Sequence, residues 1–208
     1  MKTIEVKLYS FSELSEEAKE RAVENLSTIN VNYEWWDAVY EDFENLCREL
    51  RIEVDLKKTY FNGFCCQGSG SSFNASFNLR DLLKSIEAKR HLSYAPKDAP
   101  ELCLPDIDRR VLKLLYKNYI PVYCSIKDCN GGMSVSASVS IYFDKLYSSN
   151  IDKELDKIED YCQEIADELN NWLYRRLEQE YEYLTSEEAI IDTIEANEYY
   201  FTEDGKIY

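Results

Sequence analysis

The sequence has few of the residues on which enzymes and metal sites depend. It contains one histidine, His91, which lies at the start of a predicted connection, residues 91–106, that holds three of the four prolines. No nucleophile motif lies near it, and no C-x-x-C pair, H-x-x-x-H pair or Asp-x-Asp-x-Asp-Gly loop occurs. Nucleophilic relays, zinc sites and calcium sites need such groupings. We therefore expect a protein that is not an enzyme and that holds no metal or cofactor.

Long apolar runs and an ordered set of cysteines are also missing. No stretch approaches the roughly 20 apolar residues that span a bilayer, and the opening MKTIEVKLYS alternates instead of forming a signal peptide. The seven cysteines are odd in number and include the adjacent pair Cys65 and Cys66, which disfavours a disulfide framework. Cys124 and Cys129 flank a predicted turn and would approach each other across it, but a closed zinc site needs four ligands. The sequence predicts a cytoplasmic protein with reduced thiols and no membrane contact.

Basic residues are outnumbered by acids, 24 to 40, which gives a net charge of -16. The excess acid lies at both ends, because residues 1–50 sum to -7 and residues 151–208 to -13, whereas residues 51–150 sum to +4. Such a field repels phosphates and anionic membranes. We predict no direct binding of nucleic acid and favour a protein partner with a basic surface. The alternative is that the acidic helices are only solvated.

Apolar residues at every second position predict strands in three places. Thr3–Tyr9 alternates, Ile52–Phe61 and Ser72–Phe77 form one hairpin around a glycine-containing loop, and residues 119–127 and 133–143 form a second one. We expect an α+β fold with an antiparallel sheet of about five strands, the initial strand plus two hairpins, covered by helices. The last strand has serine at each alternate position, and these small side chains would let another backbone or a ligand approach closely: Ser134, Ser136, Ser138 and Ser140.

Apolar residues at spacings of three and four predict the helices. One begins near Ser12 or Ser15, whose hydroxyls can cap it, and a short one follows Ser186. A helix over residues 33–50 has an apolar stripe, and a long C-terminal helix from Ile151 to about Leu184 has another. No segment has linker composition, so we expect one domain over residues 1–208. The stripe of residues 33–50 comprises Trp36, Val39, Phe43, Leu46 and Leu50, with Trp35 beside it.

Two features are candidate binding sites. The loop Gln67–Ser72 is rich in glycine and serine, but phosphate-cradling loops lead into a helix, whereas this one joins two strands. Its backbone N–H groups would form an anion nest for a small ligand, unless its glycines serve only a tight connection. The candidate ligand residues are Phe64, Gln67, Gly68, Ser69, Gly70 and Ser71. The acidic faces of the helices at 33–50 and 151–198 are the second candidate, through Glu41, Asp42, Glu44, Asp156, Glu159, Asp160, Glu164, Asp167 and Glu168.

Several stretches of the chain carry a resemblance to a known family. FNGFCCQGSGSSF at 61–73 and EYLTSEEA at 182–189, with YSFSELSEEAKERA near the start and Trp35-Trp36-Asp37, are similar to phage and prophage proteins often labelled as an antitoxin of a toxin–antitoxin stability system. This chain has Cys65 and Cys66 where such relatives often have an aromatic and a small residue. The resemblance implies a phage accessory protein and carries no catalytic assignment.

Three hypotheses for the function follow. The first is a non-enzymatic inhibitor of a host defence or nucleic-acid-processing protein, which acts through the acidic surfaces. The second is an antitoxin that neutralises a cognate toxin, which predicts a toxic neighbouring gene. The third is a small-ligand binder, or nucleotide sponge, that uses the Gln67–Ser72 loop.

Overall fold

The computed structural model describes residues 5–64, 67–95, 97–142 and 149–208. The chain divides into two compact units. The smaller unit combines Met1–Asp37 with Leu177–Tyr208, and the larger unit is Ala38–Arg176. That the two fold together as one domain stays a prediction. None of the described helices is both long and apolar enough to cross a membrane.

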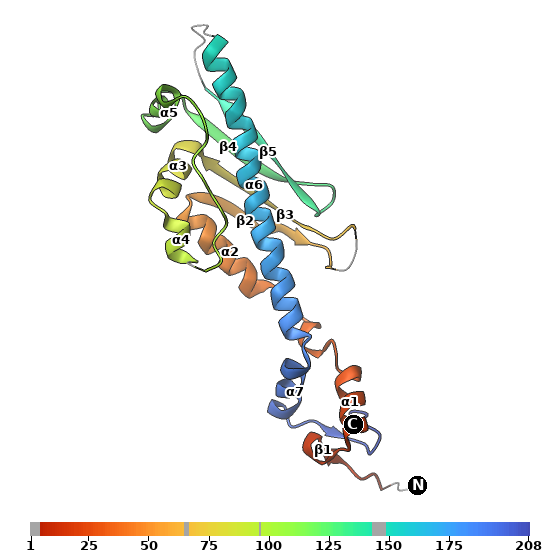
Figure 1. Ribbon diagram of the computed structural model, residues 1–208. Helices are drawn as coiled ribbons and strands as arrows, with labels where there is room; N and C mark the ends of the chain where they lie inside the picture. Colours follow the sequence, from red (N-terminus) through yellow and green to blue (C-terminus); the bar gives the residue numbers. More distant parts are fainter. Residues whose placement is uncertain (1–4, 65–66, 96, 143–148) are drawn as a thin grey trace. The chain divides into compact units, whose positions relative to one another are not determined.

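The larger unit is built on an antiparallel sheet of four strands in chain order (Figure 1). Both expected hairpins are present, and they join edge to edge, since β3 pairs with β4 from Ala75 opposite Ile126 to Asn78 opposite Tyr123. The predicted α+β class, with its antiparallel sheet and long C-terminal helix, is confirmed. The strands are β2 (Ile52–Phe61), β3 (Ser71–Asn78), β4 (Val122–Cys129) and β5 (Ser134–Ile141).

The predicted initial strand does not join this sheet. Thr3 and Ile4 lie outside the described residues, residues 5–8 are not a strand, and β1 is only Tyr9–Ser10. β1 pairs with β6 (Tyr200–Phe201) in the smaller unit. Alternation predicts a strand only where one side is buried, and the described residues of this stretch are not: Val6 is 48% exposed and Leu8 38%. The main sheet therefore has four strands where the sequence predicted about five.

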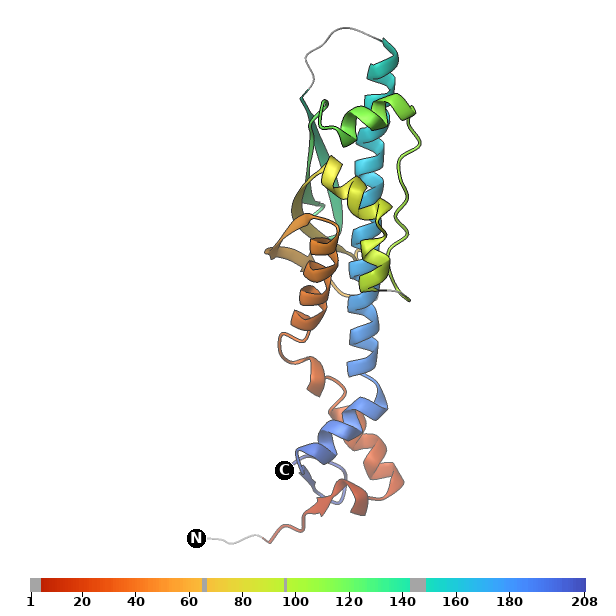
Figure 2. The same cartoon turned by 90° about the vertical axis from the view of Figure 1, so that its left-hand side faces the viewer.

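Helices cover one face of the sheet, and the core lies between them (Figure 2). The ring of Phe43 on α2 lies 4.9 Å from that of Phe73 on β3 and 6.1 Å from that of Trp172 on α6. Alternate residues of the strands, such as Cys124 and Ile126, point into this core. The helices of the larger unit are α2 (Asp37–Glu49), α3 (Leu79–Glu87), α4 (Arg90–Tyr94), α5 (Arg109–Tyr116) and α6 (Ser149–Leu184), whose last residues belong to the smaller unit.

The apolar stripe predicted for residues 33–50 is correct within the helix and wrong at its start. Val39, Phe43 and Leu46 are buried, as the spacing indicates. Trp35, which we placed beside the stripe, is buried at 8% exposure, whereas Trp36 is half-buried. The reason is that α2 begins at Asp37, so the helical period does not extend to the tryptophans before it.

The smaller unit is held by helix caps and a small apolar core. Ser15 and Ser186 cap their helices as expected, because each hydroxyl accepts a backbone N–H three residues later at 3.3 Å. Seven apolar residues pack in its core: Phe11, Leu14, Ala18, Ala22, Ile190, Ile194 and Phe201. Its elements are β1, the 3₁₀ helix Phe11–Glu13, α1 (Glu16–Asn25), the 3₁₀ helix Ile29–Val31, α7 (Glu187–Ala196) and β6.

Asn30 connects three segments of this unit. Its amide nitrogen donates to the carbonyls of Leu184 at 3.0 Å and Ala189 at 3.2 Å, and its oxygen accepts from the Thr193 hydroxyl at 2.8 Å. Asn30 is only 8% exposed, so these bonds replace the hydrogen bonds to water that its side chain loses on folding. Asn30 thereby joins the second 3₁₀ helix to the end of α6 and to α7.

Candidate acidic binding surface

The burial of α6 determines which of its carboxylates reach the surface. Its predicted apolar stripe is buried, from Leu155 through Ile158 and Cys162 to Trp172. Because a helix repeats every 3.6 residues, the acids at other phases point outward. Asp156, Glu159, Asp160, Glu164 and Asp167 are all exposed, and Glu168 is half-buried.

An open groove runs between α6 and the extended segment 101–107, which lies along the helix in Figure 2. Its volume is about 700 Å³. Six carboxylates and one ammonium group line it, together with apolar and cysteine side chains. We call this feature the acidic groove; its charged residues are Glu101, Asp106, Lys157, Asp160, Glu164, Asp167 and Glu168.

Cations lie near the groove without pairing with the carboxylates that α6 contributes to it: Lys97 and Arg175 line the adjoining pocket beside Glu168. Within the described ranges, no salt bridge involves Asp160, Glu164, Asp167 or Glu168. The one ammonium group of the groove, on Lys157, lies 2.9 Å from the Glu154 carboxylate. Like charges that line one concave surface concentrate the field there. The groove is therefore suited to cationic groups.

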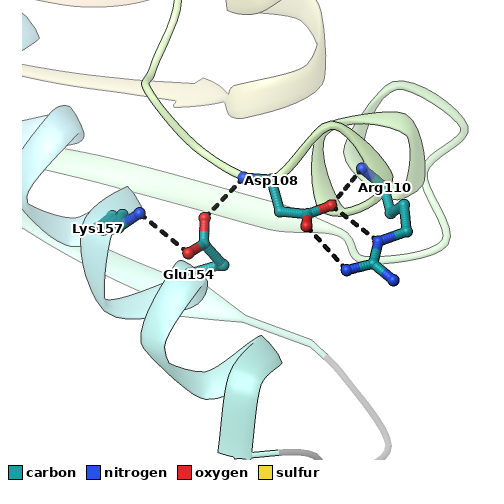
Figure 3. A network of polar contacts seen from close by, with 4 residues as sticks. All are labelled: Asp108, Arg110, Glu154 and Lys157. Carbon is teal, nitrogen blue, oxygen red and sulfur yellow. Dashed lines mark hydrogen bonds and ion pairs between the residues drawn. The ribbon is translucent and has the colours of Figure 1, made fainter.

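Polar contacts fix one end of the groove wall to α6 (Figure 3). Glu154 accepts the backbone N–H of Asp108 at 2.7 Å and the Lys157 ammonium at 2.9 Å. Asp108 in turn caps α5 and binds the Arg110 guanidinium through both carboxylate oxygens, at 3.1 and 2.9 Å. These bonds to Arg110 lower the pKa of Asp108 to about 2, and the bonds from Lys157 and Asp108 lower the pKa of Glu154.

A second contact holds the middle of the wall. The Tyr161 hydroxyl donates to the carbonyl oxygen of Cys103 at 2.9 Å. Burial raises the pKa of this tyrosine, which therefore stays protonated and able to donate at neutral pH. Segment 101–107 is thus attached to α6 through Cys103 and through Asp108 directly after it, and the acidic groove lies along that attachment.

The three acids predicted on α2 do not line the groove. Asp42 lies 4.0 Å from the Arg176 guanidinium, and Glu44 lies 3.1 Å from that of Arg48. These carboxylates have cations beside them, whereas Glu41 is exposed on the same helix. The structure therefore separates the predicted acidic set into a groove on α6 and a partly compensated group on α2.

Sequence reasoning missed three residues of this surface. Glu101 and Asp106 lie in the proline-containing connection, whose lack of periodicity gave no reason to place them against α6. Gln163 lies on α6 and bonds to the edge of the sheet: its oxygen accepts the N–H of Ala137 at 2.8 Å, and its nitrogen donates to the carbonyl of Val135 at 3.2 Å. A lone glutamine in an acidic helix carries no sequence signal for such a contact.

The end of the candidate ligand loop is used inside the fold. Ser71 is 1% exposed, and its hydroxyl donates to the side-chain oxygen of Asn170 at 2.9 Å, whose amide returns a bond to the Ser71 carbonyl at 2.9 Å. Gly70 lies so close to the Met133 carbonyl that a Cβ would overlap it. Glycine is needed at position 70 because the backbone of Met133 approaches it closely. Positive φ is found instead at Gly63, near the start of the connection between β2 and β3.

The rest of the loop is more accessible. Phe64 packs between the rings of Phe61 and Tyr174, at 5.7 and 5.5 Å. Gln67 is exposed, and Gly68 and Ser69 are half-buried. The loop joins β2 to β3 as expected, and ligand binding there stays a prediction.

Cys103 lines the acidic groove, whereas His91, Cys124 and Cys162 are buried elsewhere in the larger unit. His91 is 3% exposed, and burial lowers the pKa of its imidazole, so it is neutral at pH 7. Cys124 and Cys129 do not approach each other, because both lie on β4, five residues apart along one extended strand. Cys124 instead contacts Cys162 of α6, and this contact, together with burial, raises the pKa of the Cys162 thiol. No group of three or more potential metal ligands was found among the residues described.

Comparison with protein families gives one match, to the family described as "Domain of unknown function (DUF8835)", over residues 35–187. The chain belongs to the DUF8835 family. The DUF8835 match covers well over half of the 208 residues and contains the whole larger unit, including the acidic groove. No curated protein and no solved structure matches the chain significantly.

Proposed function

We propose that this protein is a phage-encoded, non-enzymatic binding protein that inhibits a host defence or nucleic-acid-processing protein through the acidic groove. The observation that supports this most is the concentration of six carboxylates around one groove, whose described lining includes a single cation, Lys157, already paired with Glu154. Repulsion between these carboxylates lowers the stability of the free protein. A partner that supplies cations to the groove would relieve this repulsion when it binds.

The chemistry of the groove favours a basic protein surface over other partners. Lysine and arginine side chains that enter it gain charge-assisted hydrogen bonds from carboxylates already held in place. Nucleic acid phosphates and anionic lipids would be repelled by the same field. Proteins that process nucleic acids carry basic grooves, so an acidic surface can occupy the site where phosphates would bind.

The setting rests on the resemblance of both ends and the first hairpin to phage and prophage accessory proteins. An accessory protein that lacks a recognisable catalytic motif acts most simply by binding. The acidic groove offers one surface for that binding.

A four-residue replacement tests the proposal. The groove variant is Asp160→Asn, Glu164→Gln, Asp167→Asn and Glu168→Gln. The control variant removes the same number of charges from exposed acids of the smaller unit: Glu20→Gln, Glu24→Gln, Asp192→Asn and Glu195→Gln. Each is expressed in cells that carry defence systems, and plaque formation by sensitive phages is counted. We expect the wild type and the control to restore plaques against one system and the groove variant to fail. If the groove variant inhibits as well as the wild type, the proposal is wrong.

A further inference from the structure

β5 forms one edge of the sheet, and the contact with Gln163 shows which of its groups face outward (Figure 1). The N–H and C=O groups of successive strand residues point to opposite sides. Since the N–H of Ala137 bonds to Gln163 rather than to β4, the groups of Val135, Val139 and Ile141 also point away from the sheet.

The two edges of the sheet differ in how they are protected. On β2 the pairing register shifts between Asp55 and Thr59, and exposed lysines occupy the irregular stretch at Lys57 and Lys58. Such bulges and lysines prevent another strand from pairing. β5 pairs with β4 in an unbroken register along its whole length, and Ser134–Ile141 contains neither a charged residue nor a proline. One edge is thus blocked, and the other is open.

Gln163 occupies only part of the open edge. Its side-chain amide donates to the carbonyl of Val135 and accepts the N–H of Ala137, as the backbone of a neighbouring strand would. In the portion of the chain that the structure describes, nothing bonds to the outward N–H and C=O of Val139. An unpaired edge with good strand geometry is a surface that extended peptides use.

We propose that β5 accepts an extended, lysine- or arginine-bearing segment of the partner protein as an added strand. This inference rests on the proposed function and states how the partner is held. Glu159 and Asp167 lie one helical turn before and after Gln163, and both are exposed. We expect them to bind cationic side chains of a strand laid along this edge. The Asp167 carboxylate accepts the Gln163 amide at 2.9 Å and also lines the acidic groove.

Two further features select this occupant. The exposed hydroxyl side chains of Ser136, Ser138 and Ser140 are small enough to leave the edge accessible to a backbone. A second copy of this chain could in principle pair at the same edge, but it would bring a net charge of -16 with its own acids beside the contact. The charge of the flanking helix therefore favours a basic segment over self-association.

The test measures binding of a synthetic eight-residue peptide of alternating lysine and valine to the full chain by fluorescence anisotropy. Val139→Pro removes the outward N–H without removing a bond to β4. We expect this variant to bind at least about tenfold more weakly, whereas Val139→Thr, which keeps the N–H, should bind within about threefold of the wild type. Glu159→Gln with Asp167→Asn should also weaken binding, and an alternating glutamate–valine peptide should not bind.

A second peptide tests the inference on the wild type, so that the result does not depend on whether Val139→Pro folds. The same lysine–valine peptide with alternate backbone nitrogens methylated has no donors for the edge, so the wild type should not bind it. Equal binding of the methylated and unmethylated peptides would overturn the inference. So would a wild-type dimer, seen by sedimentation, that Val139→Pro makes monomeric. If the wild type binds neither peptide while the groove variant still loses inhibition in cells, the edge inference fails and the proposed function stands.

Discussion

Removing the groove carboxylates should stabilise the protein at the same time as it abolishes inhibition. The groove variant replaces four acids of α6 by their neutral isosteres. In the wild type these acids repel each other along the helix, because Glu164 lies three or four residues from each of Asp160, Asp167 and Glu168. The isosteres keep the helix propensity and the size of each side chain, and Asp167→Asn keeps an oxygen for the Gln163 amide.

The expected gain follows from the number of repulsive pairs. Like charges three or four residues apart on an exposed helix face destabilise it by about 0.2–0.5 kcal/mol each. The three pairs centred on Glu164 therefore come to about 1 kcal/mol, and the carboxylates of Glu101 and Asp106 across the groove act in the same direction. For a chain of this size, a gain of about 1 kcal/mol raises the unfolding midpoint by about 2–4 °C.

Thermal unfolding followed by circular dichroism at low and high salt measures this effect. At 1 M salt the screening length falls to about 3 Å, so the difference between the variant and the wild type should shrink. The control variant removes a comparable number of like-charge pairs, such as Glu20 with Glu24 and Asp192 with Glu195, so its midpoint should rise by a similar amount while its inhibition stays intact. If the groove variant is less stable than the wild type at low salt, its carboxylates hold the structure together and our argument for an uncompensated groove is refuted.

Three further predictions concern the scaffold. Asn30→Ala should destabilise the smaller unit by about 1–3 kcal/mol, because the Leu184 carbonyl loses the Asn30 amide as its donor, whereas the Ala189 carbonyl keeps the Thr193 hydroxyl. The exposed Asn32→Ala should change the unfolding free energy by less than about 0.5 kcal/mol in urea titrations. Gly205→Ala should lower the unfolding free energy by at least about 2 kcal/mol, since φ is +81° and a Cβ would overlap the Ala18 carbonyl. Gly131→Ala, at φ +66° in open space, should lower it by only about 1 kcal/mol. Similar losses in the two variants would contradict the packing at Gly205. The pKa of Asp108 is lowered to about 2 in the folded chain, so the stability lost in Asp108→Asn should be constant above about pH 5 and disappear as the pH falls toward 2; a pH-independent difference would exclude this carboxylate as the cause.

Local patterns in the sequence were sufficient for most elements of the larger unit. The stripe of α6 is buried where the pattern placed it. The alternation in β5 is correct in its sides, but its apolar side is buried only at Val135 and half-buried at Ala137, Val139 and Ile141. The caps at Ser15 and Ser186 follow from the hydroxyl and the N–H groups of the next turn. Such features depend on residues a few positions apart, which a sequence displays directly.

Contacts between distant residues could not be predicted in this way. The alternating stretch that ends at Tyr9 resembled a sheet strand, but of its described residues only Tyr9 pairs, and it pairs, with Ser10 beside it, to Tyr200–Phe201. The compensation of Asp42 depends on Arg176, far along the chain, and the groove wall at 101–107 is held by Glu154 and Tyr161. Composition identified the acids, and only the fold shows which of them gather without a cation.

Quantitative affinity purification from the native host tests the central claim most directly. Tagged wild type, groove variant and control variant are expressed at equal levels, and the proteins recovered with each are compared by mass spectrometry. We predict a partner with a basic surface that is recovered with the wild type and the control and is lost with the groove variant. Recovery of the same partner in equal amounts with all three would contradict the claim that the acidic groove of α6 binds it.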